Sequence, residues 1–584
     1  MSLSTSRLPT NRSNDDLKLW LRSFLKQIRL FPALRAILRL WKIASDRPLR
    51  RQENQLRQEF AAFKKHVGSS LLWSASSGRA GRRALVISVG FPSGIKAELG
   101  LIQGLRAAGY EPVVLAKREP WVAAYYRLAG LREILFWDQF IRPLAPSAVL
   151  SAFDRVETMA SLLKVTREGV RVGRFAASTC LRNLRVGTLD LKDPSIRTAV
   201  RIALGESMTH ADAAVRILRI IQPQLALFVD RGYTPQGEIF DRCLAAGVDA
   251  VTWNIAHKNN VLMLKRYTPE NRDDHPASLS EESWRRIQRL PWSREKGDRI
   301  RQELFEAYAS GDWYSEVGTQ FLAKMASAAQ LKERIGLDGS KKTAVIFPHI
   351  LWDGTFFWGH DLFDSYEQWL VETVRAACAN RNVNWIIKIH PANLIKNARD
   401  GVTGQPAELA VIAKQVGRLP DHIRMIQPES DISTFSLYGI SDYCVTVRGT
   451  VGIEAALFGI PVLTAGTGRY DRKGFTIDSE TREEYLSRIA RIQDLPRLTP
   501  NEVELAERFA SGIFLWRPLP IRSFTLEYQK DSRASIKTEI LPKTERQWRK
   551  APDVAAFAAW VAGSKETDFL SGVSPEQPAM ATHP

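Results

Sequence analysis

The sequence predicts an α/β protein with two Rossmann-like, doubly wound domains and a helical extension in front of them. Two observations predict this class. Short strands rich in Val, Ile and Leu alternate with helices over two long stretches, and polar residues gather where those strands end. In addition, 584 residues with a hydrophobic fraction of 45% suffice for more than one core.

Shifts in composition divide the chain into six segments. A Ser, Gly and Ala-rich linker ends the first of them, and the two α/β stretches are separated by a polar, charge-rich helical stretch. The expected segments are a basic extension and linker at 1–80, a first domain at 82–267, a helical bridge at 268–340, a second domain at 341–495, helices that pack back at 496–570 and a disordered tail at 571–584.

The charge balance is strongly basic, with a formal net charge of +19 from 82 Lys and Arg against 63 Asp and Glu. Such an excess attracts nucleic acid, acidic lipid or phosphorylated substrates. Nucleic acid is not an expected partner, because no zinc-finger, RRM-like or helix-turn-helix signature is present. The four cysteines lie far apart and have no partner at metal-ligand spacing, which is typical of reduced thiols in a reducing compartment.

The stretch at 17–44 contains seven basic residues and no acidic one, with Trp, Phe, Leu and Ile between them. A helix with one basic and one apolar side is typical of a membrane interface. The alternative is an amphipathic helix packed on its own domain or on a second copy. No signal peptide and no run of about 20 apolar residues is recognisable, so we expect a cytoplasmic chain or one on the cytoplasmic face of a membrane.

The first domain opens with a strand at 84–89, a helix that ends near Gly109 and a second strand, which together form one βαβ unit. Its glycines do not match GxGxxG, so we predict no NAD site. Two later strands end in polar residues, and such ends face the ligand crevice of an open α/β sheet. The candidates there are Asp230, Arg231, Tyr233, His257 and Lys258.

In the second domain, four strand ends carry ionisable or polar residues. These are His349 and Asp353 after the first strand, Lys388 and His390 after the second, Gln427, Glu429 and Ser430 after the third, and Arg448, Gly449, Thr450 and Glu454 after the fourth. Since parallel strands end at the same side of a sheet, this density predicts a site for a polar, anionic ligand.

The fourth of these strand ends, "VRGTVGIEAALFG", predicts a phosphate-binding turn before a short helix. Gly449 and Gly452 would let the backbone approach a phosphate, and the amides at 450–453 would favour its charge. Arg448 would add charge-assisted hydrogen bonds, and Glu454 would accept hydrogen bonds from ribose hydroxyls. The alternative is that Glu454 stabilises the helix dipole and pairs with Arg448.

The motifs "IKIHP", "QPES" and "RGTVGIEAALFGIPVLTAGTGRY", in this order, resemble bacterial capsule and surface-polysaccharide glycosyltransferases. They are most similar to the capsule-synthesis family that includes β-Kdo transferases. The likeness covers 82–490 in layout and 343–475 in motif. It implies a GT-B architecture, in which two Rossmann-like domains face a cleft and the second binds the sugar nucleotide.

The resemblance also implies roles for individual residues. His390 and Pro391 match the HP motif that contacts the donor phosphate or an acidic sugar. Gln427 and Pro428 match a QP position, and the loop at 448–454 matches the donor-nucleotide loop. Asp353 falls near a carboxylate at the reaction centre, but the aromatic-rich loop around it departs from the family, so Asp361 and Asp364 are alternatives.

The expected activity is therefore transfer of a sugar from a nucleotide-activated donor, such as CMP-Kdo, to a growing capsule or lipid-linked glycan. Asp353 would be a general base or a stabiliser of an oxocarbenium-like sugar, and His390, Lys388 and Arg448 would hold the donor phosphate without a metal ion or other cofactor. We expect Asp230, Arg231 and His257 to bind the acceptor, and the stretch at 17–44 to attach the chain to the inner membrane.

Two other activities are compatible with the sequence. The first is a transferase of polyol phosphate from a CDP-activated donor, and the second is a non-enzymatic basic protein that binds lipid or nucleic acid. A metal site at His349 and His360 is not expected, because their spacing matches no familiar ligand set.

Overall fold

The computed structural model describes residues 47–67, 81–314, 324–531 and 534–571. The predicted interfacial helix at 17–44, nearly all of the predicted linker and the tail from 572 lie outside the described residues. Two compact units are distinguished, 1–71 and 72–584. In the first, helix α3 (Arg47–Val67) has Lys64, Lys65 and His66 in its last turn, where positive charge suits the helix dipole.

The first domain is built on a seven-stranded sheet with the order β13-β6-β5-β4-β1-β2-β3. Its strands are β1 (Arg82–Ile87), β2 (Tyr110–Ala116), β3 (Ile134–Phe136), β4 (Leu225–Phe228), β5 (Asp249–Ile255), β6 (Val261–Tyr267) and β13 (Pro518–Pro520). The pairings from β3 to β5 are parallel, whereas β6 and β13 are added antiparallel. The doubly wound core order of a Rossmann sheet is thus present, with an antiparallel edge that the sequence did not predict.

Helices α4 (Pro92–Ala107), α5 (Pro120–Leu128) and α10 (Gln236–Ala245) connect the strands of this sheet. Between β3 and β4 the chain forms several helices instead of a single crossover helix. They are η1 (Trp137–Gln139), α6 (Pro146–Phe153), α7 (Met159–Leu163), α8 (Val172–Leu184) and α9 (Pro194–Ile221). Helix α8 brings this excursion to the loops of the second domain, because Ser178 Oγ donates to the carbonyl of Thr355 at 2.6 Å.

The second domain has a six-stranded sheet with the order β12-β11-β10-β7-β8-β9, and every pairing in it is parallel. The strands are β7 (Thr343–Ile346), β8 (Asn384–Lys388), β9 (Ile423–Ile426), β10 (Tyr443–Thr446), β11 (Val462–Thr464) and β12 (Ile477–Asp478). The helices are α14 (Tyr366–Ala379), α15 (Ala392–Asp400), α16 (Ala407–Gln415), α17 (Thr434–Tyr438), α18 (Thr450–Ala456) and α19 (Arg482–Ala490). The predicted α/β class with two doubly wound sheets is confirmed.

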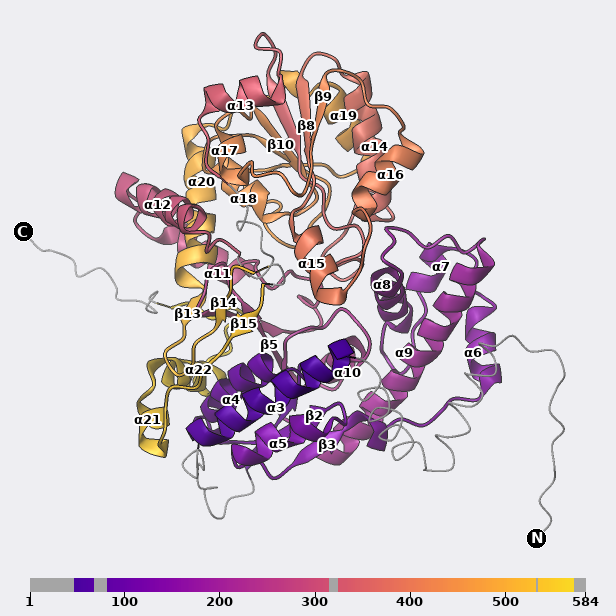
Figure 1. The fold of residues 1–584 in the computed structure, drawn as a ribbon, viewed down its shortest axis with the longest axis vertical. Coiled ribbons are helices and arrows are strands. Elements are labelled where there is room, and N and C mark those ends of the chain that lie inside the picture. The colour runs from indigo at the N-terminus through magenta and orange to yellow at the C-terminus, as the bar shows by residue number, and fades with distance from the viewer. Residues whose placement is uncertain (1–46, 68–80, 315–323, 532–533, 572–584) are drawn as a thin grey trace, which may run out of the picture. The chain divides into compact units, whose positions relative to one another are not determined.

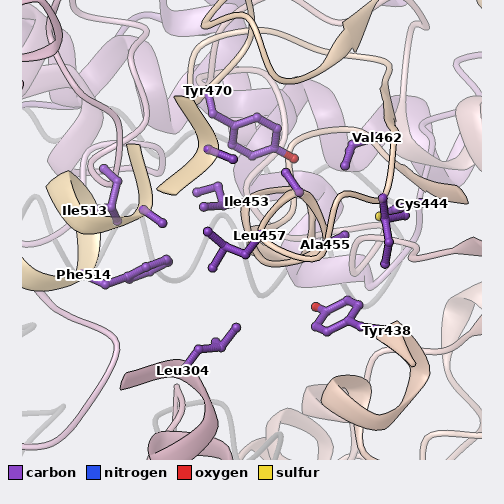
Figure 2. Packing of buried hydrophobic residues seen from close by; sticks show 14 of the residues in the cluster. Leu304, Tyr438, Cys444, Ile453, Ala455, Leu457, Val462, Tyr470, Ile513 and Phe514 are labelled. Carbon is purple, nitrogen blue, oxygen red and sulfur yellow. The ribbon is translucent and has the colours of Figure 1, made fainter. Parts of the chain in front are cut away.

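Both faces of this second sheet are covered by apolar side chains. On β7, Val345 belongs to one buried cluster, whereas Ala344 and Ile346 belong to the cluster on the opposite face. Figure 2 shows the first cluster, in which Ile453 of α18 and Leu457, just after this helix, lie near Ile513 and Phe514. Strands that are apolar on both faces explain the continuous Val, Ile and Leu runs of the sequence.

The bridge and the C-terminal stretch join the two domains. The bridge contains three helices, α11 (Glu281–Arg289), α12 (Arg294–Ser310) and α13 (Ala328–Ile335). The C-terminal stretch after α19 contains η3 (Ile492–Asp494), α20 (Pro500–Ser511), η4 (Gly512–Trp516), β14 (Glu527–Tyr528), β15 (Ile536–Lys537), α21 (Glu545–Lys550) and α22 (Pro552–Gly563). Helix α20 packs on α11, α12 and α18, and α22 packs on α4 of the first domain (Figure 1). Among the described residues, no helix has the length and apolar character needed to span a bilayer.

Candidate active site

The strand order of the second sheet reverses between β7 and β10, and ligands of open α/β sheets bind outside the carboxyl ends of the strands at such a point. His349 follows β7 and Arg448 follows β10. The two meet directly, because the amide of Arg448 donates to His349 Nε2 at 3.2 Å. The structure therefore brings together the first and fourth of the predicted strand ends.

His390, at the end of β8, is an uncharged hydrogen-bond donor in this structure. Its Nδ1 accepts the amide of Ala392 at 3.1 Å, which leaves the ring proton on Nε2. Burial, together with the charges of Lys396 and Lys388, lowers the pKa of His390 to about 4. The ring is neutral at pH 7, so it can donate from Nε2 to an anion without carrying charge itself.

Lys388 is a cation whose nearest opposing charge, that of Asp431, forms no ion pair with it in the described part of the chain. Its side chain is buried, with 4% of the residue exposed, and among the described residues its ammonium group has no hydrogen bond or ion pair. Burial lowers the pKa of Lys388 to about 8 against the weak opposing effect of Asp431, which is itself paired with Arg334 at 2.5 Å. A buried, unpaired ammonium group is unfavourable unless an anion reaches it.

The guanidinium of Arg448 is almost fully buried, with 2% of the residue exposed, and it is neutralised. It forms an ion pair with Asp361 and donates to the hydroxyl of Tyr366 and the carbonyl of His360, both at 3.2 Å. Asp361 is thereby paired with Arg448 and stays an alternative to Asp353 as the catalytic carboxylate. The alternative interpretation expected an ion pair between Arg448 and Glu454. Among the described residues, Arg448 pairs with Asp361 instead.

In the loop at 448–454, side-chain packing explains why position 452 is glycine. A Cβ atom at position 452 would clash with the hydroxyl of Tyr470, which donates to the carbonyl of Gly449 at 2.8 Å. The amide of Gly452 is used as well, because it donates to the same Gly449 carbonyl at 3.0 Å. Gly452 is therefore required by Tyr470, and close approach of a phosphate is not needed to explain it.

Glu454 points into the protein interior, with 1% of the residue exposed. Its carboxylate accepts hydrogen bonds from Tyr308 Oη at 2.6 Å, Tyr438 Oη at 2.7 Å and Trp313 Nε1 at 3.2 Å. Burial raises the pKa of Glu454, and these three donors oppose that shift. Both oxygens are occupied, so the predicted contact with ribose hydroxyls has no geometric support.

Asp353 connects the two domains. Its carboxylate accepts from Tyr233 Oη, after β4, at 2.8 Å and forms an ion pair with Lys396 of α15. Burial alone would raise the pKa of Asp353, but Lys396 outweighs burial and lowers the pKa to about 2. The group is ionised throughout the physiological pH range and is a weak base, which suits stabilisation of positive charge better than proton abstraction. The other alternative, Asp364, is exposed.

The three residues predicted to bind the acceptor lie in different environments. Arg231 is buried, donates to the carbonyls of Arg272 and Asp274, and lies over the rings of Phe240, Tyr267 and Trp358. His257 is also buried and bonds Glu303 at 3.0 Å. These two side chains hold the domain together, because a buried polar group needs such partners. Asp230 remains partly exposed, 3.9 Å from Arg182.

At the end of β9, Gln427 and Glu429 are exposed, and the amide of half-buried Ser430 donates to the carbonyl of Gln427 at 3.1 Å. Thr450 and Gly449 are half-buried at the start of α18. Polar groups that sequence reasoning missed are Lys396, which follows the HP motif by five residues, and Arg469, in the quoted "TGRY". Both follow strands of the second sheet, so the same strand-end rule could have found them.

Residues 297–496 match the sequence family described as capsule polysaccharide biosynthesis protein. No curated protein matches the chain. Among solved structures, the β-Kdo 2,4-transferase of Thermosulfurimonas dismutans KpsC is similar with 13% identity and a TM-score of 0.31, over 54% of this chain and 84% of that one. The β-Kdo 2,7-transferase of the same protein has 14% identity and a TM-score of 0.31, over 53% and 82%.

A glycosyltransferase from Rickettsia africae has 11% identity and a TM-score of 0.25, over 75% of this chain and 95% of that one. The family match begins within helix α12 and covers the second domain, including the strand ends of its sheet. Residues 297–496 are therefore similar in sequence to capsule polysaccharide biosynthesis proteins, the family that the motifs of the second domain resemble.

Proposed function

We propose that this chain is a glycosyltransferase that moves a sugar from a nucleotide-activated donor of the CMP-Kdo type to a growing capsule or surface-polysaccharide glycan. One observation carries the proposal: at the end of β8, a buried and unpaired Lys388 lies beside His390, whose Nε2 is free to donate. A cation and a neutral donor at the carboxyl ends of parallel strands form a site for a phosphoryl group.

The donor would lie along the strand ends of the second domain. Lys388 and His390 bind its phosphoryl group, and the hydroxyl of Thr450 lies at the neighbouring start of α18. Exposed Gln427 and Glu429 contact the nucleoside. As the bond between the anomeric carbon and the phosphate oxygen breaks, the leaving phosphate is neutralised by these side chains, and a metal ion is not required.

Asp353 would act at the sugar. Its carboxylate is ionised and fixed by Tyr233 and Lys396, so it is preorganised to stabilise the positive charge that develops at the anomeric carbon. The acceptor would enter from the first domain near Asp230. Asp353→Asn should therefore abolish sugar transfer and leave nucleotide affinity within about twofold, because the carboxylate does not contact the phosphoryl group.

A lipid-linked acceptor would explain the basic stretch at 17–44, which we propose holds the protein at the inner membrane. Deletion of residues 1–66 should move the protein from the membrane fraction to the supernatant. A full-length variant with the seven basic residues of 17–44 changed to Gln is the matched control, and should be released equally. Unchanged fractionation of both variants would refute this attachment.

The decisive experiment is a donor screen. Thermal stabilisation is measured with CMP-, UDP-, GDP- and CDP-linked compounds for the wild type, His390→Gln and His422→Gln. His422 lies in the same domain and bonds a carbonyl, that of Ala377, at 3.0 Å, so it is a matched control. We expect one sugar nucleotide to stabilise the wild type and His422→Gln but not His390→Gln. Stabilisation by CDP-glycerol alone would favour a polyol-phosphate transferase, and no stabilisation by any donor would refute both enzymatic functions.

A further inference from the structure

Two guanidinium groups, those of Arg448 and Arg469, lie at the loop before α18. Arg469 follows β11 and is buried, with 8% of the residue exposed. Its guanidinium donates to the carbonyl of Arg448 at 3.1 Å and to Thr450 Oγ1 at 3.4 Å. The two arginines thus belong to one cluster, which includes the residue that sequence reasoning chose and one that it overlooked.

Arg448 and Arg469 differ in whether a carboxylate neutralises the guanidinium charge. Arg448 has a carboxylate partner in Asp361, whereas Arg469 makes no ion pair among the described residues. The buried Nε atoms of both arginines lack a hydrogen-bond partner, so the ion pair alone distinguishes them. Asp471, two residues further on, does not neutralise Arg469, because its carboxylate accepts the backbone amides of Gly468 at 2.6 Å and Arg469 at 3.2 Å. A buried guanidinium bonded only to a carbonyl and a hydroxyl is incompletely satisfied.

Among the described residues, no carboxylate forms an ion pair with Arg469. Glu454 lies within electrostatic range of Arg469, but its carboxylate is already bonded to Tyr308, Tyr438 and Trp313. His349 accepts the amide of Arg448, and His275 Nδ1 accepts the amide of Ala277 at 3.0 Å. Burial and the neighbouring arginines, Arg469 among them, lower the pKa of both rings, so neither ring is charged at pH 7. The rings have their remaining nitrogens protonated and are donors, as Arg469 is. The cluster therefore presents several donors and one uncompensated positive charge.

We propose that Arg469 is the guanidinium that binds a phosphoryl group of the nucleotide donor, and that Arg448 is a positioning residue that holds the loop through Asp361. This proposal rests on the proposed function. Arg448 cannot bind an anion fully while it is paired with Asp361. The hydrogen-bond acceptors of Arg469, the carbonyl of Arg448 and the hydroxyl of Thr450, are uncharged, so Arg469 can exchange them for an anion without breaking an ion pair. The sequence predicted Arg448 as the phosphate-binding arginine, and we propose Arg469, 21 residues further along the chain, in its place.

The test compares Arg469→Gln, Arg469→Lys and Arg424→Gln. Arg424 of β9 is the matched control, because its guanidinium also bonds only carbonyl oxygens, those of Ile335, Gly336, Asp421 and Ile423. Affinities are measured by calorimetry for the nucleoside mono- and diphosphate of the donor found in the screen, for the nucleoside alone and for inorganic pyrophosphate. Melting temperatures show whether each variant is folded.

Arg469→Gln should weaken binding of the nucleotides about 10- to 100-fold, as expected for loss of hydrogen bonds between charged groups, and should leave nucleoside binding unchanged. Arg469→Lys keeps the charge but loses the fork, so its loss should be smaller. Arg424→Gln should bind as the wild type does. If Arg469→Gln does not fold, Arg469→Lys decides the question by the same comparison of nucleotide with nucleoside.

Nucleotide binding by Arg469→Gln within twofold of the wild type would overturn the proposal, as would equal losses for nucleotide and nucleoside. A loss confined to pyrophosphate would also overturn it, because Arg469 would then serve a phosphoryl group other than the donor's. Failure of the proposed function is recognised separately, since the wild type itself would then bind none of the nucleotides.

Discussion

Replacement of Glu454 by alanine should destabilise the second domain without acting on a ligand contact. The substitution removes the acceptor of three buried donors, on Tyr308, Trp313 and Tyr438. An unsatisfied buried donor costs about 1–3 kcal/mol. Both tyrosine hydroxyls donate to the same carboxylate oxygen, Oε2, so in its absence one can donate to the other, which recovers part of this loss. We therefore expect the free energy of unfolding to fall by about 3–5 kcal/mol.

Urea unfolding followed by intrinsic fluorescence measures this loss. The double variant Glu454→Ala, Tyr308→Phe should recover about 1 kcal/mol or more, because it removes one of the unsatisfied hydroxyls. Glu429→Ala is the control, since Glu429 is an exposed glutamate of the same domain and its loss should change stability by less than about 0.5 kcal/mol.

Glu454→Gln separates the structural role from the ribose contact that the sequence suggested. Glutamine keeps an acceptor for the buried donors, so the variant should fold and bind the nucleotide within about twofold of the wild type. The reasoning is refuted if Glu454→Ala costs less than about 1 kcal/mol while Glu454→Gln loses nucleotide affinity tenfold, because Glu454 would then face the ligand.

Two further predictions concern the same strand ends. Burial lowers the pKa of Lys388 to about 8, so its positive charge is present at pH 7 and is lost as the pH rises through 8. Nucleotide affinity measured by calorimetry should therefore fall from pH 7 to pH 9 in the wild type but not in Lys388→Arg. A flat wild-type profile would contradict the role of Lys388. Gly452→Ala should lower stability by about 1–3 kcal/mol through its clash with Tyr470. Tyr470→Phe should restore part of this loss in thermal melts, and a stable Gly452→Ala variant with lost nucleotide binding would instead favour phosphate approach.

The fold could be predicted from the sequence where local pattern decides it. The central strands are apolar on both faces, and their continuous Val, Ile and Leu runs are recognisable without any knowledge of partners. Strand β6 was missed because its sequence "VLMLKRY" contains two adjacent cations, Lys265 and Arg266. Lys265 is tolerated there because it is buried in an ion pair with Asp568, 303 residues further along the chain. No local pattern contains that partner.

The candidate site, like the fold, could be predicted from the sequence only where the local pattern decides it. The rule that parallel strands end at one side of a sheet placed His349, Lys388, His390 and Arg448 correctly relative to the strands, because it needs only the local sequence. The rule could not predict which of these side chains is neutralised by a partner elsewhere in the folded protein. Asp361 neutralises Arg448 from a loop 87 residues earlier, and Tyr308 occupies Glu454 from a helix 146 residues earlier.

Compensation of charge is therefore what separates binding residues from structural ones among the strand ends. Arg448, Glu454 and Asp361 have oppositely charged or hydrogen-bonding partners within the protein, and folding alone accounts for their presence. Lys388 and Arg469 are buried to a similar degree but lack a carboxylate partner among the described residues. Burial of an unpaired cation costs several kcal/mol, and stability alone would select against it. The proposed anionic ligand would recover this cost at both residues. The two cations, rather than the glycines, are therefore the features of this domain that most favour the proposed phosphoryl site.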